Sequence, residues 1–194
     1  MPIDGCTSTF AGLAADILPS YMKSVRSALT QARPLTEFCA PGVGARTLLK
    51  RLARTKDFSG CYMLVREGKP FYVGISRSVV ARLLQHGKGK THFDASLAYR
   101  MACEKVDHNM TREEAMKDTA FREAFNDAQR LLRGSSVAFV EITNPLELYV
   151  FEAYCAMELD TAEWNTFRTQ WHSLTMDPLP SLGGHEIKST NVGR

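Results

Sequence analysis

Tyr62, Tyr72, Arg82 and His86 are the side chains of this sequence best suited to act together chemically. The two tyrosines lie on segments that are predicted to pair as a β-hairpin over 60–76, so their hydroxyl groups could converge on one face. Arg82 and His86 stand at i and i+4 of the helix that follows and share one of its sides. Phenol and imidazole groups transfer protons, and a guanidinium binds anions. A strand tyrosine or a lone histidine usually only packs, but the four together form an unusual set.

Glu152 is a fifth candidate, because it lies in the middle of an almost wholly apolar segment, LELYVFEAYCAMEL. Such a helix is expected to be buried. No cationic residue stands three or four positions from Glu152, and a buried carboxylate without a partner costs several kcal/mol. The carboxylate therefore meets an arginine or a divalent metal from elsewhere, or it lies at the helix edge in contact with solvent. Both interpretations stay open at this point.

Basic and acidic residues are segregated along the chain. Residues 41–56 hold five basic and no acidic side chains, residues 66–90 hold six basic against one acidic, and residues 141–163 hold six acidic and no basic ones. A phosphate-binding face beside a cation-binding patch would give this pattern, and so would ordinary solvated faces. The candidate nucleic-acid-binding residues are Arg46, Lys50, Arg54, Arg77, Lys88 and Lys90. The first three form one stripe of a predicted helix, 44–55, which could equally be an ordinary amphipathic helix.

Length and composition fit one globular domain with an extension. The chain has 194 residues, of which 44% are hydrophobic and 23% charged, with a formal net charge of +3. Five widely spaced cysteines without a CxxC pair predict neither a zinc site nor a disulfide framework, and they favour a cytoplasmic location. No apolar run of about 20 residues is present, and the start of the chain lacks the basic region of a signal peptide. We therefore expect no membrane association.

The elements that must position these residues indicate an α+β fold. Thr111 and Glu114 form a capping box, and Asn144 followed by Pro145 is typical of a helix start. A small three-stranded antiparallel sheet flanked by helices is the natural packing. Strands are predicted at 60–66, 71–76 and 135–143, and helices at 8–31 with a break near Pro19, 44–55, 78–86, 92–105, 111–133 and 145–159.

The candidate residues also resemble the signature of the GIY-YIG nuclease family. GCY at 60–62 and YVG at 72–74 are similar to the two halves of that signature. Arg82 and His86 stand where the family carries its arginine and the following His or Tyr. Glu152 looks like the family's metal-binding glutamate, and Asn165 resembles its closing asparagine. The resemblance covers about residues 59–168. It departs from the family in Cys61 and Val73, which replace isoleucines, and in the long stretch between Arg82 and Glu152.

The resemblance implies a nuclease-like catalytic domain (59–170) with a helical insertion at about 107–134. The sequence pattern outside it predicts a helical N-terminal extension (1–58) and an irregular tail (171–194). The resemblance also implies an endonuclease that hydrolyses phosphodiester bonds in DNA. The implied catalytic residues are Tyr62, Tyr72, Arg82, His86, Glu152 and Asn165.

Each of these residues has an implied role. Glu152 would hold one divalent cation, Mg²⁺ or in its place Mn²⁺. Tyr62 would act as general base or position the attacking water, with Tyr72 and His86 assisting. Arg82 would stabilise the transition state, and Asn165 would support the site. Double-stranded DNA is the expected partner, with a homodimer where both strands are cut. Two alternatives stay open: a nuclease effector or toxin acting on RNA or DNA, and a non-catalytic nucleic-acid-binding module.

Overall fold

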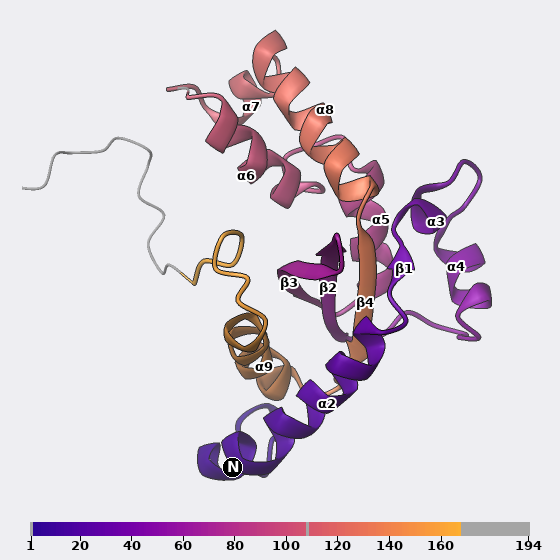
Figure 1. Cartoon of the computed structure of the whole chain (residues 1–194), viewed down its shortest axis with the longest axis vertical. Coiled ribbons are helices and arrows are strands. Elements are labelled where there is room, and N and C mark those ends of the chain that lie inside the picture. The colour runs from indigo at the N-terminus through magenta and orange to yellow at the C-terminus, as the bar shows by residue number, and fades with distance from the viewer. Residues whose placement is uncertain (1, 108, 168–194) are drawn as a thin grey trace, which may run out of the picture.

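The computed structural model describes residues 2–107 and 109–167 and has the expected α+β architecture (Figure 1). The tail expected at 171–194 lies outside the described residues. The strands form one antiparallel sheet in the order β1-β4-β2-β3. Their bounds are β1 Arg33–Pro34, β2 Gly60–Arg66, β3 Lys69–Ser76 and β4 Ser136–Glu141.

The expectation of three strands is wrong, because the N-terminal region adds a fourth. Arg33 and Pro34 pair with Val137 and Ser136 of β4. A two-residue strand has no alternating pattern to recognise, and its partner lies about a hundred residues away in sequence. Proline is tolerated in this position because β1 is an edge strand. The N-terminal residues are thus part of the sheet.

Helices cover the sheet and agree closely with the predicted ones. Asn144 accepts a hydrogen bond from the Glu147 N–H, and Thr111 and Glu114 form the expected capping box. The chain also has a short 3-10 helical turn at Ile3–Gly5 and a π-helical stretch at Leu13–Ile17. The α-helices are α1 Phe10–Gly12, α2 Leu18–Leu29, α3 Thr36–Cys39, α4 Ala45–Arg51, α5 Val79–Lys88, α6 Ser96–Lys105, α7 Arg112–Ala115, α8 Thr119–Arg133 and α9 Pro145–Glu158.

Several helices differ from the predictions. Helix α3 was not predicted, α4 ends at Arg51 instead of 55, and α6 begins at Ser96 instead of 92. Helical structure runs without a break past Pro19, because the proline falls in the first turn of α2 and the preceding π-helical stretch accommodates it. The single helix predicted over 111–133 is instead two helices, α7 and α8. The second one starts afresh because Asp118 accepts a hydrogen bond of 2.8 Å from the Phe121 N–H and so caps its N-terminus.

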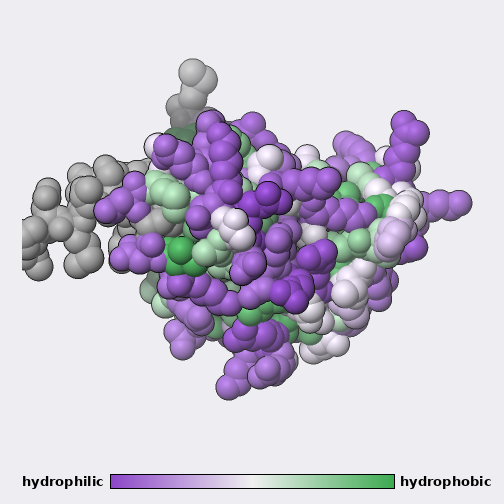
Figure 2. All heavy atoms as spheres, turned by 90° about the horizontal axis from the view of Figure 1, so that it is seen from above, coloured by the Kyte–Doolittle hydropathy of each residue, from purple (hydrophilic) through white to green (hydrophobic). Residues whose placement is uncertain are grey.

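The sheet separates two buried clusters of side chains. Strand β2 is central, and its side chains alternate between them. Tyr62 and Leu64 join the cluster formed with α5, α6 and α8, whereas Cys61 and Met63 join the cluster formed with α2 and α9. Helices α5 and α9 therefore lie on opposite sides of the β2–β3 hairpin. The face of the molecule drawn in Figure 2 is mainly hydrophilic, with scattered apolar side chains.

Candidate active site

The β2–β3 hairpin brings the two tyrosines to one face, as the alternation predicted. Tyr62 pairs with Gly74 and Leu64 pairs with Tyr72, so Tyr62 and Tyr72 are diagonal neighbours. Their ring centroids are 6.2 Å apart. His86, from α5, lies with its ring centroid 5.5 Å from that of Tyr62 and 6.0 Å from that of Tyr72. Three of the predicted site residues thus form one aromatic cluster.

Tyr62 and His86 are a buried hydrogen-bonded pair. The Tyr62 hydroxyl lies 2.7 Å from His86 Nε2, and the two side chains are 1% and 0% exposed. Burial lowers the pKa of His86 to about 3, with a further contribution from the nearby Arg82 charge. Burial also raises the pKa of Tyr62 well above its usual value. At neutral pH the imidazole is therefore neutral and the phenol keeps its proton, so Tyr62 can donate to Nε2.

Gly74 is what allows the Tyr62 ring to lie where it does. A Cβ atom on Gly74 would stand 2.5 Å from both Cζ and Oη of Tyr62. The ring therefore lies across the backbone of the opposite strand, in space that any other residue would fill. The glycine of the YVG triplet is thus explained by close packing across the hairpin.

Tyr72 lies where opposite charges meet. Its side chain is partly buried, and burial raises the pKa of its hydroxyl. The positive charges of Arg82 and Arg100 lower that pKa, and the negative charge of Glu152 raises it. Tyr72 is therefore close enough to two guanidinium groups and one carboxylate to be influenced by all three. The Arg82 charge also acts on Tyr62, whereas the charges of Arg100 and Glu152 act on Tyr72.

Arg82 is held in place by hydrogen bonds from the two terminal nitrogens of its guanidinium group. Nη1 donates to the Asp94 carbonyl at 3.0 Å and to Gln85 Oε1 at 3.2 Å, and Nη2 donates to Ser96 Oγ at 2.7 Å. A guanidinium has five N–H donors, so these bonds leave donors for an anion. The arginine is both held in place and able to bind a phosphate.

Glu152 carries a partly buried carboxylate on α9. Burial raises its pKa. Within residues 2–107 and 109–167, no hydrogen bond or ion pair joins it to another side chain. The arginine partner that the sequence left open is therefore not found in the described part of the chain.

A divalent cation is the other partner that the sequence left open for Glu152. Mg²⁺ binds oxygen ligands and commonly keeps several waters, so it needs few protein ligands. The described residues contain no cluster of three His, Cys, Asp or Glu side chains that could enclose a metal. A cation at Glu152 would accordingly be completed by water and by substrate oxygens.

Asn165 holds the outer edge of β3. Its Oδ1 accepts the Val73 N–H at 2.8 Å, and its Nδ2 donates to the Val73 carbonyl at 2.7 Å. The side-chain amide thereby makes the two bonds that another strand would make. Asn165 thereby holds the strand that carries Tyr72.

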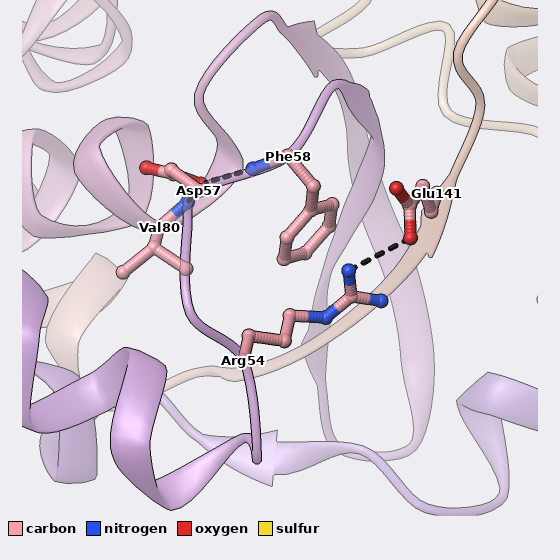
Figure 3. Close-up of polar contacts among 5 residues, drawn as sticks. All are labelled: Arg54, Asp57, Phe58, Val80 and Glu141. Carbon is pink, nitrogen blue, oxygen red and sulfur yellow. Dashed lines mark hydrogen bonds and ion pairs between the residues drawn. The ribbon is translucent and has the colours of Figure 1, made fainter.

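Two further residues shape the site and were not foreseen from the sequence. Arg100 of α6 donates from Nη2 to the Trp164 carbonyl at 2.8 Å, and its charge acts on Tyr72. Arg100 lies four residues after Ser96, which binds Arg82, so both share one side of α6. This i, i+4 spacing is the feature of the sequence that could have pointed to Arg100. Asp57 accepts from the backbone N–H groups of Val80 and Ala81, both at 2.9 Å, and so caps α5 from a distant loop (Figure 3).

The basic residues proposed to contact nucleic acid divide into two groups. Arg54 is ion-paired with Glu141 at 2.7 Å and its guanidinium lies 4.1 Å from the centre of the Phe58 ring, which ties the loop before β2 to the end of β4 (Figure 3). Lys88 donates to two backbone carbonyls at 3.0 and 2.7 Å. Both residues thus make internal contacts. Exposed side chains are found at Arg46, Lys50, Arg77 and Lys90.

No protein-family model, curated protein or solved structure matches this chain. None of the described helices is long and apolar enough to cross a membrane. The function is therefore argued from the geometry of the site.

Proposed function

We propose that this protein is a metal-dependent endonuclease of the GIY-YIG type that hydrolyses phosphodiester bonds in DNA. The observation that carries the proposal is the environment of the Tyr72 hydroxyl. Arg82 and Arg100 supply positive charge there, and Glu152 supplies a carboxylate that has no hydrogen-bond or ion-pair partner among the described residues. Guanidinium groups suit a phosphate, a carboxylate suits a divalent cation, and a phenol between them suits proton transfer. Hydrolysis of a phosphate diester uses all three.

The chain's own groups have distinct parts in this reaction. Arg82 and Arg100 would bind the non-bridging oxygens of the scissile phosphate and stabilise the charge that grows on them in the transition state. Tyr72 would orient the attacking water and accept its proton. Burial raises the pKa of its hydroxyl, and the positive charges of Arg82 and Arg100 act against that rise. A divalent cation held by Glu152 would supply Lewis-acid polarisation of the phosphate and stabilise the leaving oxygen.

The structure favours a different role for Tyr62 from the one expected. Its hydroxyl is buried, hydrogen-bonded to His86 and raised in pKa. A general base must reach the water that it deprotonates, and a fully buried phenol with a neutral partner is poorly placed to do so. We assign proton transfer to Tyr72. The Tyr62–His86 pair then positions Tyr72 by packing against it.

The partner that we propose is double-stranded DNA, bound through the exposed basic residues, with a homodimer where both strands are cut. We also propose a reducing, cytoplasmic location, in which the five cysteines stay reduced.

Plasmid cleavage tests the proposal. Supercoiled plasmid would be incubated with the wild type and with Glu152→Gln, Arg82→Met and Glu158→Gln proteins, in Mg²⁺, Mn²⁺ or EDTA. Glu158 is the matched control, because it is a second glutamate of α9 that is exposed and paired with Arg26. We expect metal-dependent nicking by the wild type and the control, lost in the other two variants. Tight DNA binding without cleavage would instead favour the non-catalytic binding module, and cleavage of RNA alone would favour the effector alternative.

A further inference from the structure

We propose that Phe93 is a stacking platform for an unpaired base next to the phosphate that is cleaved. The substrate class would then be DNA that is single-stranded or locally unpaired at the cleavage point, such as a branch or a frayed end. This inference rests on the proposed nuclease function and specifies its substrate. It is carried by the exposure of Phe93, by the rigidity of its loop and by the link of that loop to Arg82.

Phe93 is the more exposed member of a pair of adjacent rings whose planes are inclined by 40°. Its side chain is 72% exposed, whereas His92 beside it is buried. The two ring centroids are 4.0 Å apart, and His92 in turn lies 5.7 Å from the ring of Tyr99 in the core. The phenyl ring is thus supported from behind by a buried ring, while most of its surface faces solvent. This is the arrangement of a platform on which a flat group can stack.

The loop that carries Phe93 is fixed by hydrogen bonds on both sides. Thr91 Oγ1 donates to Asp94 Oδ2 at 2.9 Å and accepts from the Asp94 N–H at 3.1 Å. Gln129 of α8 donates to the Gly89 carbonyl, and the Gly89 N–H donates to the Gln85 carbonyl at 2.8 Å. A base that stacks on Phe93 therefore pays little entropy to order the loop, which favours binding.

The same loop is bonded directly to the arginine of the site. Arg82 Nη1 donates to the carbonyl of Asp94, the residue after Phe93. Consecutive Cα atoms are about 3.8 Å apart, so the backbone of Phe93 lies one residue away from the point where the loop is bonded to Arg82. Lys90, three residues before Phe93, is exposed and adds positive charge to the same loop.

An exposed aromatic ring with cations beside it is the combination that proteins use to bind single-stranded nucleic acid. In a fully paired duplex the bases are stacked on one another, so a ring in this position would have no free base face to contact. The ring would gain a partner where the substrate is unpaired. We therefore infer selectivity for unpaired nucleotides and no sequence preference, because every base has a face that can stack.

Phe10 provides a matched control. It is also a phenylalanine, it is 71% exposed, and it lies in α1 at the N-terminal end of the chain. Wild type, Phe93→Ala, Phe93→Trp and Phe10→Ala proteins would be compared for binding in EDTA, so that no cleavage occurs. The probes are a single strand of about 12 nucleotides, within the usual size of such sites, and the same sequence as a duplex. Both carry a fluorescent adenine analogue whose emission is quenched on stacking.

We expect Phe93→Ala to bind the single strand about tenfold more weakly than the wild type, which is within the range of one lost base stack, and to lose the quenching. Phe93→Trp should keep both, Phe10→Ala should match the wild type, and duplex binding should change little in all four. Equal single-strand affinity and quenching in Phe93→Ala and wild type would overturn the inference, as would an equal loss for single strand and duplex.

Cleavage of branched and fully paired DNA in Mg²⁺ separates this inference from the proposed function. If the wild type binds single strands through Phe93 but cleaves nothing in any metal, the nuclease proposal fails and the stacking site stands. If the wild type cleaves both DNAs and Phe93→Ala cleaves both at the same rates, the stacking site fails and the nuclease proposal stands. A wild type that neither binds nor cleaves nucleic acid refutes both.

Discussion

Replacing Gly74 with alanine is expected to break the Tyr62–His86 pair. The added Cβ would stand 2.5 Å from Tyr62 Cζ and Oη and 3.0 Å from Cε1. Carbon atoms in contact prefer about 3.5–4.0 Å, so the ring must move by about 1 Å or more. Because Tyr62 is 1% exposed and packed against the rings of Tyr72 and His86, it has no free space to move into.

The magnitude follows from two costs. Overpacking a well-packed site typically costs about 1–3 kcal/mol. A shifted Tyr62 hydroxyl also leaves His86 Nε2 without its partner, and His86 Nδ1 already has no partner among the described residues. A buried polar group left without a hydrogen bond costs about 1–3 kcal/mol. We therefore expect Gly74→Ala to lower the free energy of unfolding by about 2–6 kcal/mol, a large part of the 5–15 kcal/mol typical of a folded protein.

Urea unfolding of Gly74→Ala, with Gly134→Ala as control, measures this cost. Gly134 has an ordinary φ of −75°, and a Cβ there would stand 3.5 Å from the nearest atoms, which is normal contact. Since alanine restricts the unfolded chain, the control should match the wild type or gain up to about 1 kcal/mol. If Gly74→Ala unfolds within about 0.5 kcal/mol of the wild type, the packing of Tyr62 against Gly74 does not have the importance argued above.

Three further predictions follow from the charged groups. Mg²⁺ should raise the melting temperature of the wild type but not that of Glu152→Gln, and a metal response in the variant would place the cation elsewhere. Without metal at pH 7 the variant should be at least as stable as the wild type. Burial raises the pKa of Glu152 in the folded state above its unfolded value, so keeping this carboxylate ionised at pH 7 costs stability. The free energy of unfolding of the wild type should fall by up to about 1.4 kcal/mol per pH unit between pH 6.5 and about 3, since in this range only the unfolded state protonates His86. Urea unfolding of His86→Gln should show a smaller decrease over the same range. Arg100→Met should slow cleavage and move the rising limb of its pH–rate profile to higher pH, because the guanidinium charge lowers the pKa of Tyr72 and the general base must be deprotonated. An unshifted rising limb would exclude Tyr72 as the group that titrates there.

Local signals in the sequence were enough to predict the elements that carry the site. The alternation along 60–66 and 69–76 placed Tyr62 and Tyr72 on one face, and the register confirms it. The capping box and the Asn144–Pro145 start were readable because their partners lie within three or four residues. In each case the physics is local, so the pattern is written in neighbouring residues.

Features that depend on distant partners could not be predicted. Strand β1 exists only because β4 offers an edge, and Asp57 caps α5 from 23 residues away in sequence. The same holds for chemical roles. Tyr62 was expected to be the general base because its position matched, but whether a phenol is buried or accessible is decided by the whole fold, and burial raises its pKa.

The position of β3 at the edge of the sheet explains why the site forms where it does. Helix α5, with Arg82, packs on one face of the hairpin, and α9, with Glu152, packs on the other. In the middle of a sheet these charges would be separated by a layer of strands. At the edge, both can influence Tyr72. The outer backbone N–H and C=O groups of an edge strand have no neighbouring strand to pair with. At Val73 both of these groups are hydrogen-bonded by the single side chain of Asn165. The proposed site therefore needs the open edge of the sheet, since a fifth strand there would displace Asn165 and cover the groups that we propose to contact the substrate.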